Sequence, residues 1–347
     1  MPKKIILFSD GTWNKPEQKD RDRLSPSNVV KIARALEAYD NDGLEQRRFY
    51  DRGVGAEGGM FNKILGGMTG LGISKNIKDL YEFLVNNYEE EDKIYCFGFS
   101  RGAYTVRSLC GLINKCGLLR KNHINNIDAA YSLYRKRWLN KDHPKAINFR
   151  SGYSIEVKIH FIGVWDTVGA LGFPTPFLRL LTRPLYRFHD EKLSPIVLNA
   201  FQALAIDECR VHFTPSIWKK EGVQNYQTVE QVWFPGVHTN NGGGYVDAGL
   251  SDISFLWMKS KAEKCGLKFN DDYINRMINP DSFGELRNSR KLFYLLFRKF
   301  IRPINKDENI NEFVHMSALE RMNEITISYT PENLLNVMAK GTIPITE

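Results

Sequence analysis

The sequence predicts an α/β fold, in which a mostly parallel central sheet carries helices on both faces. Three observations lead to this prediction. Apolar runs of strand length alternate with stretches of helical spacing, most runs stop at a polar or glycine-bearing turn, and the run at residues 93–99 passes straight into an amphipathic stretch. A chain of 347 residues can bury a large core. We therefore expect a single domain over residues 1–347, with an inserted cap or lid around 170–200 and a mainly helical segment at 251–347.

The motif Gly-Phe-Ser-Arg-Gly at residues 98–102 is the centre of the prediction. In a nucleophile elbow, the serine lies on a sharp, strained turn between a strand and a helix, with its oxygen exposed at the carboxyl end of the strand. Gly98 and Gly102 stand where a side chain would collide in so tight a turn. Helical spacing before the run, at residues 74–88, completes the helix, strand, elbow and helix of an α/β-hydrolase. Ser100 is therefore the candidate nucleophile.

The first predicted strand, residues 4–9, ends in a polar turn that this fold uses to build half of an oxyanion hole. Backbone N–H groups of Gly11 or Thr12 can supply one donor and that of Arg101 the other, so that both point at the oxygen of a tetrahedral intermediate. The alternative is a polar turn capped by Asp10.

A helix is expected at residues 29–36, capped by Ser27 or Asn28, and a strand at 47–51. Residues 53–58 then match the Gly-x-Gly-x-x-Gly dinucleotide fingerprint. That fingerprint must open a helix, whereas here further glycines follow. We expect a glycine-rich loop that borders the mouth of the active site, and no nucleotide site.

Beyond the elbow helix, helical spacing at residues 122–140 leads into a polar connector at 141–154, followed by a strand at 157–165. This strand stops at Asp166. A carboxylate at the carboxyl end of a core strand is where a triad acid lies, although a turn cap is the alternative.

Residues 172–187 combine apolar side chains with arginines and prolines and contain no acidic residue. This composition suits a lid that meets an anionic lipid surface, and it equally suits a buried insertion. Helical spacing returns at residues 194–208.

A strand is predicted at residues 231–237, and His238 follows it at the start of a glycine-rich loop. This position suits a general base that must reach a serine at the end of another strand. The chain order Ser100, Asp166, His238 is that of α/β-hydrolases. His212 and His189 are the reserve candidates.

The segment after residue 250 predicts a helix at 253–262 and a basic, apolar helix at 290–301. The second helix could lie on a membrane, but so apolar a face is more commonly part of a core.

Composition excludes several classes of function. Five scattered cysteines indicate neither a disulfide framework nor a zinc site. The net charge of +8 favours anionic partners, yet no nucleic-acid recognition pattern accompanies it, so we expect no nucleic-acid partner. The amino terminus lacks the pattern of a signal peptide and no stretch is long enough to span a bilayer, which predicts synthesis as a soluble cytoplasmic protein.

Taken together, eight blocks in one order resemble the type VI secretion phospholipase effector-like α/β-hydrolases, over nearly the whole chain. The blocks are residues 8–14, 50–55, 98–103, 163–169, 203–208, 233–238, 242–245 and 315–317. The resemblance implies cleavage of phospholipid esters by a Ser-Asp-His triad, whose matching positions are Ser100, Asp166 and His238. After the histidine the family has Ser-Asp-Val, whereas this chain has Thr239, Asn240 and Asn241.

The leading hypothesis is a serine esterase that acts on a phospholipid or membrane-surface substrate and needs no metal or organic cofactor. Arg52, Arg107 and Trp13 are the candidate substrate-binding residues. If the protein is exported by a type VI-like secretion system, an immunity protein and a secretion spike protein are the expected partners. Two alternatives stand beside this hypothesis. One is a small-ester or thioester hydrolase or acyltransferase, and the other is a degenerate hydrolase that only binds a membrane or a protein.

Overall fold

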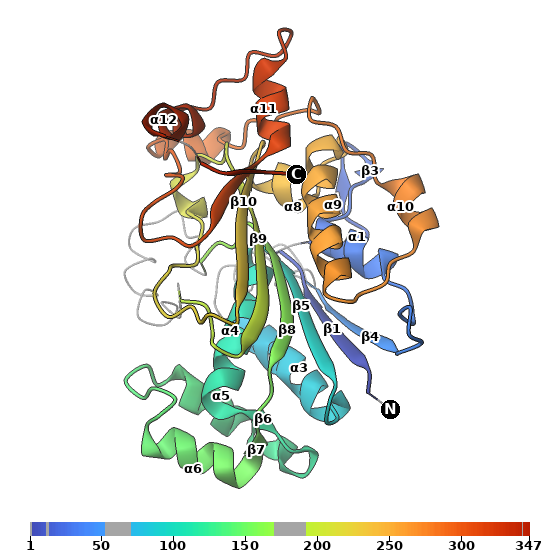
Figure 1. Ribbon diagram of the computed structural model, residues 1–347, viewed down its shortest axis with the longest axis vertical. Coiled ribbons are helices and arrows are strands. Elements are labelled where there is room, and N and C mark those ends of the chain that lie inside the picture. The colour runs from blue at the N-terminus through green and yellow to red at the C-terminus, as the bar shows by residue number, and fades with distance from the viewer. Residues whose placement is uncertain (1, 12–13, 53–70, 170–191, 342) are drawn as a thin grey trace.

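A computed structural model of the chain describes residues 2–11, 14–52, 71–169, 192–341 and 343–347 (Figure 1). Its centre is a sheet of eight strands, in the order β12-β11-β10-β9-β8-β5-β1-β4. All neighbouring strands in this sheet are parallel, so their carboxyl ends meet at one edge. The strands are β1 (Lys4–Ser9), β4 (Gln46–Asp51), β5 (Lys93–Phe99), β8 (Ile159–Trp165), β9 (Val197–Ala205), β10 (Thr228–Phe234), β11 (Glu312–His315) and β12 (Ile345–Thr346).

Helices cover both faces of this sheet, as Figure 1 shows. In β5, Ile94 and Cys96 belong to one core cluster and Tyr95 and Phe97 to the other, because successive side chains of a strand point to opposite faces. The predicted fold class is therefore confirmed. The first face packs against α3 (Leu71–Asn87) and α4 (Arg101–Cys116), with α5 (Ile127–Arg135) and α6 (Pro144–Tyr153) beyond them; the second packs against α1 (Asn28–Ala35), α9 (Gly249–Lys264) and α10 (Asp271–Met277).

The segment from residue 251 onward joins the same sheet. The predicted helix at 253–262 lies within α9, and the segment also supplies β11 and β12. A third apolar cluster, which includes Leu204, Trp233 and Leu334, packs β11 and the last helices against β9 and β10. Those helices are α11 (Met316–Asn323) and α12 (Glu332–Lys340).

Three predictions of local structure are wrong. Residues 194–208 form strand β9 and not a helix, because the run is buried between β8 and β10, and burial outweighs the helix preference of its alanines and leucines. Residues 141–154 contain α6, which starts at Pro144 behind a His143 cap. The predicted helix at 290–301 is only the 3-10 turn η3 (Leu292–Leu296).

Within the part of the chain that the structure describes, no helix has both the length and the apolar character needed to cross a bilayer. All five cysteines are free, in agreement with the prediction from their spacing. Most of the predicted cap or lid, residues 170–191, and the glycine-rich stretch at 53–70 lie outside the described residues.

Candidate active site

The predicted triad residues all lie at the carboxyl edge of the sheet. Ser100 directly follows β5 and Asp166 directly follows β8, the neighbouring strand. The backbone N–H of Ser100 donates to the carbonyl of Trp165 at 3.0 Å, which holds the serine beside the start of the Asp166 turn. His238 comes after β10 and opens the short helix α8 (His238–Gly242), where a glycine-rich loop was predicted.

The turn around Ser100 has the backbone strain of an elbow. Ser100 has φ 57° and ψ −119°, a conformation rarely adopted outside glycine, and α4 begins at the next residue. A Cβ atom on Gly102 would lie 2.0 Å from the carbonyl oxygen of Ser9, and one on Gly98 would lie 2.7 Å from the amide nitrogen of Ala103. Both glycines are therefore required by close backbone contact, as the motif predicts.

The imidazole of His238 and the carboxylate of Asp166 form a buried hydrogen bond between Nδ1 and Oδ2. Two aromatic rings hold the imidazole in place. The ring of Phe99 lies 4.7 Å from it and the ring of Phe213 lies 5.0 Å from it, measured between centroids. Because Phe99 directly precedes Ser100, these contacts hold the imidazole at the end of β5.

A buried arginine that sequence analysis missed binds the same carboxylate. Arg302 donates from Nη1 to Asp166 Oδ1 at 2.6 Å and from Nη2 to Oδ2 at 2.9 Å, and both side chains are fully buried. The guanidinium also donates to the carbonyls of Ala205 and Phe213. Burial alone would raise the pKa of Asp166. The charge of Arg302 and the contact with His238 outweigh burial and hold that pKa well below its ordinary value.

No sequence signal points to Arg302, because it follows no motif and lies far along the chain from Asp166. Glu208 lies in the block at residues 203–208, but no role in the site was predicted for it from the sequence. Its carboxylate accepts a hydrogen bond from the backbone N–H of His238 at 3.3 Å and pairs with Arg210 at 2.8 Å. It thereby fixes the start of α8.

The predicted oxyanion loop is held by Asp10. The carboxylate of Asp10 accepts hydrogen bonds from Ser27 Oγ at 2.6 Å, from the hydroxyl of Tyr50 at 2.7 Å and from the backbone N–H of Gly11 at 2.7 Å. The N–H of Gly11 is therefore bonded within the turn, which agrees with the alternative interpretation of Asp10 as the cap of a polar turn. Thr12 lies outside the described residues. Arg101 is the first residue of α4, where helix geometry leaves the amide N–H outside the helix's own hydrogen bonds.

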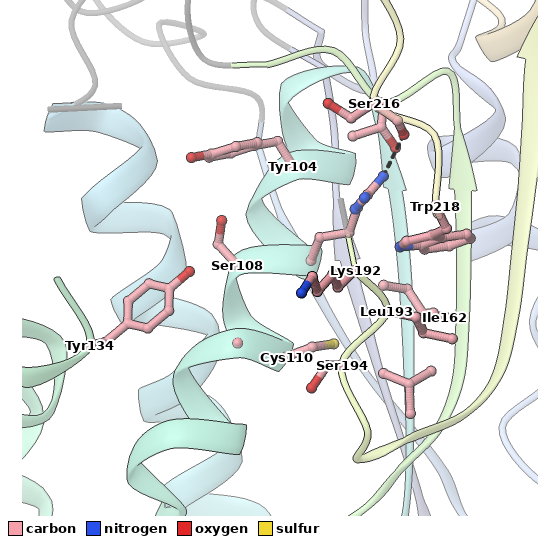
Figure 2. A pocket seen from close by; sticks show the side chains of 14 residues that line it. Tyr104, Ser108, Cys110, Tyr134, Ile162, Lys192, Leu193, Ser194, Ser216 and Trp218 are labelled. Carbon is pink, nitrogen blue, oxygen red and sulfur yellow. Dashed lines mark hydrogen bonds between the residues drawn. The ribbon is translucent and has the colours of Figure 1, made fainter. Parts of the chain in front are cut away.

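The structure gives the predicted substrate-binding arginines other contacts. Arg107 donates to the carbonyl of Ser216 at 2.6 Å and lies over the ring of Trp218, on the wall of a small cavity beside α4 (Figure 2). This cavity, of about 30 Å³, is too small for a lipid headgroup. Arg52 is exposed just beyond β4, and Trp13 lies outside the described residues.

Asn240, at a position where the sequence resemblance predicts an aspartate, bonds to backbone groups. Its Oδ1 accepts from the N–H groups of Val237 and Arg287, each at 3.3 Å, and its Nδ2 donates to the carbonyl of Glu285 at 2.9 Å. A carboxylate could not make the last of these bonds. Asn240 therefore caps α8 and ties it to residues 285–287.

Of the two reserve histidines, the structure describes only His212. His212 lies in the 3-10 helix η2 (Val211–Phe213), where its ring packs 4.8 Å from that of Phe297, and His189 lies outside the described residues. Among the described residues, no group of three or more His, Cys, Asp or Glu side chains is arranged to hold a metal ion.

A family model agrees with this architecture. Residues 3–261 match the model described as the catalytic domain of the type VI secretion system phospholipase effector Tle1-like proteins. The chain belongs to this family. Membership assigns it to a family of hydrolases and covers Ser100, Asp166 and His238, whereas Arg302 lies beyond the matched residues.

This Tle1-like chain is also similar to a yeast protein and to two proteins of solved structure. An uncharacterised protein of Saccharomyces cerevisiae, YEL023C, is 31% identical over 237 residues, which are 61% of this chain and 32% of the yeast protein. A crystal structure of an uncharacterised Pseudomonas aeruginosa protein is 16% identical with a TM-score of 0.48, and covers 81% of this chain and 49% of that one. The Tle1 effector bound to the VgrG spike is 20% identical with a TM-score of 0.42, over 72% and 52% of the two chains. This Tle1-like chain thus spans about a third to a half of the length of these relatives.

Proposed function

We propose that this Tle1-like chain is a serine hydrolase that cleaves the carboxylic esters of phospholipids with Ser100, His238 and Asp166. One observation carries the proposal. A buried histidine, hydrogen-bonded through Nδ1 to a carboxylate, packs against Phe99, the residue that directly precedes a serine on a strained turn between a strand and a helix. This is the set of roles that a nucleophile, its base and the group that orients the base require. The phospholipid substrate class is supported by family membership.

The reaction proceeds in two halves. With Nδ1 of His238 bound to Asp166, Nε2 accepts the proton of Ser100 as its Oγ attacks the acyl carbonyl. The backbone N–H of Arg101 and a second donor from the loop at residues 10–13 stabilise the tetrahedral oxyanion. Its collapse breaks the ester bond, and His238 protonates the departing lysophospholipid oxygen. Water, deprotonated by His238, then attacks the acyl-enzyme, which releases a fatty acid and regenerates Ser100.

A fluorophosphonate probe tests this proposal, because it reacts with a serine only where the hydroxyl is activated. The wild-type protein should be labelled and should hydrolyse soluble esters. Ser100→Ala should remove both properties, and His238→Ala should lower labelling by about 10³-fold or more. Ser108→Ala, within helix α4 that follows the turn, is the matched control and should label like wild type. A folded wild type that does not react would leave a protein that only binds its target, and would overturn the proposal.

We also propose that the chain is exported by a type VI-like secretion system with a spike protein as carrier and an immunity protein in the producing cell. Family membership and the relative seen bound to a VgrG spike support this part. Release of the protein from its native cells should stop when the spike gene is deleted. Unchanged release would contradict the spike as carrier and leave the chemistry of Ser100 untouched.

A further inference from the structure

Residues 289–302, which we call the rim segment, are fastened at both ends to the candidate active site. At one end, Ser289 Oγ donates to Glu208 at 3.0 Å, and Glu208 in turn accepts from the backbone of His238. At the other end, Arg302 binds Asp166. The rim segment, including the turn η3, is therefore held beside the candidate triad although it lies outside the family match.

The inward side of the rim segment is aromatic. The ring of Tyr294 packs edge-on against Phe213 at 6.2 Å between centroids, and Phe213 itself contacts the imidazole of His238. Phe297 packs against His212. The contacts of Tyr294 with Phe213 and of Phe213 with His238 therefore connect η3 to the candidate base.

The outward side of η3 is apolar and unusually exposed. Leu295 is 59% exposed and Leu296 is 80% exposed, side by side at the tip of the turn. The prediction that this stretch belongs to the core does not hold for these two side chains. Two backbone carbonyls of this turn already have a partner, because Arg290 Nη2 donates to those of Leu295 at 3.2 Å and Phe297 at 2.5 Å. A turn whose carbonyls are bonded internally can enter an apolar phase at a lower desolvation cost.

The flanks of this tip are basic. Residues 286–306 contain seven lysines and arginines and no acidic residue, in a chain whose net charge is +8. Arg302 pairs with Asp166 and Arg287 pairs with Asp20, so these two face the protein. Lys291, Arg298 and Lys299 are exposed on either side of the two leucines. Exposed leucines between exposed cations are the composition of a surface that meets anionic lipid headgroups and the acyl boundary beneath them.

We propose that Leu295 and Leu296, together with Lys291, Arg298 and Lys299, form a docking surface for an anionic phospholipid bilayer. This inference rests on the proposed function and adds to it the place where the enzyme meets its substrate. Whatever binds to the outer side of η3 is connected to His238 through only two ring contacts, Tyr294 with Phe213 and Phe213 with His238. A bilayer is the occupant that brings an ester to Ser100, whereas a protein held there would compete with substrate for the same approach.

Sedimentation with lipid vesicles tests the surface without any turnover, because the Ser100→Ala protein is used throughout. Vesicles of phosphatidylcholine alone are compared with vesicles that also contain phosphatidylglycerol. The double substitution Leu295→Ser with Leu296→Ser should weaken binding to both kinds by about tenfold or more, because two partly inserted apolar side chains are replaced by polar ones. The triple substitution Lys291→Gln, Arg298→Gln and Lys299→Gln should weaken binding to the anionic vesicles alone by about a hundredfold, at about 1 kcal/mol for each charge.

The controls lie near α5 and α6, which Figure 1 places at the opposite end of the molecule from α8. Trp138 is 79% exposed, so Trp138→Ser removes a comparable apolar side chain, and Lys136→Gln with Lys141→Gln and Lys145→Gln removes three exposed charges. Both controls should bind like the parent. Equal binding by the rim variants and the controls would overturn the docking surface. Hydrolysis of a soluble ester by the Ser100 protein is a separate readout, so failure of the proposed chemistry is distinguishable from failure of the surface.

Discussion

Replacing Asp166 with asparagine is expected to lower the rate constant for hydrolysis of a soluble ester by about 10⁴-fold, the loss typical of this change in a serine triad. The physical reason is the direction of one hydrogen bond. The ionised carboxylate accepts from Nδ1 of His238, so Nε2 is left without a proton and can act as the base. An asparagine amide can present its NH₂ group to Nδ1, and the imidazole then carries its proton on the wrong nitrogen.

The rate is to be measured per folded molecule, because the change also leaves Arg302 without its charged partner. Asp252→Asn is a matched control: Asp252 is another buried carboxylate paired with a cation, Lys31, at 2.6 Å on α9. This control should lose stability and keep its rate. If Asp166→Asn kept a rate close to wild type in a folded protein, Asp166 would not be the group that orients His238.

Replacing Arg302 with glutamine is expected to lower the free energy of unfolding by about 3–5 kcal/mol, the usual loss when one partner of a buried ion pair is removed. The carboxylate of Asp166 would keep its contact with His238 and lose the two short bonds that now neutralise it. Urea unfolding of both proteins measures this loss. Arg302→Lys keeps the charge without the paired geometry, so it should recover part of the stability.

The same substitution should change the dependence of kcat/KM on pH, which a purely structural arginine would not do. In the wild type, burial lowers the pKa of His238 below its ordinary 6.5, and Arg302 keeps the pKa of Asp166 below its ordinary 3.8. At pH 6.5 the imidazole of His238 is then mostly neutral and the carboxylate of Asp166 is ionised, as the proposed mechanism requires. We expect activity to fall only at lower pH. Without Arg302, burial raises the pKa of Asp166, so the acidic limb should move to higher pH. An unmoved limb together with an unchanged unfolding energy would contradict the role given to Arg302.

The sequence predicted the position of those candidate residues that depend on their immediate neighbours in the chain. Ser100 and Asp166 each end a strand, and an apolar run that stops at a polar residue is visible in a single sequence. His238 was predicted by the same reasoning, although β10 ends earlier and the histidine opens a short helix. The need for glycine at positions 98 and 102 was predicted from the geometry of the motif, and the space at both positions agrees, because an added Cβ atom would collide with neighbouring backbone.

Other features depend on distant contacts and leave no local trace. Arg302 reaches Asp166 across 136 positions of the chain. Phe213 contacts His238 only because η2 is folded back over α8. In β9 and in η3 the spacing of apolar residues favours a helix, and the surroundings decide otherwise. β9 pairs with a strand on each side. In η3, the contacts of Arg290, Tyr294 and Phe297 take the place of a longer helix.

The pairing of Asp166 with Arg302 also sets an order of events during synthesis. A ribosome that has translated residues 3–261 has already made the serine, the acid and the histidine, but not the cation that neutralises the acid. The strands β11 and β12, which complete the sheet, come later still. The nascent chain therefore carries the candidate triad for some time without this cation, and the buried ion pair can form only after translation has passed residue 302.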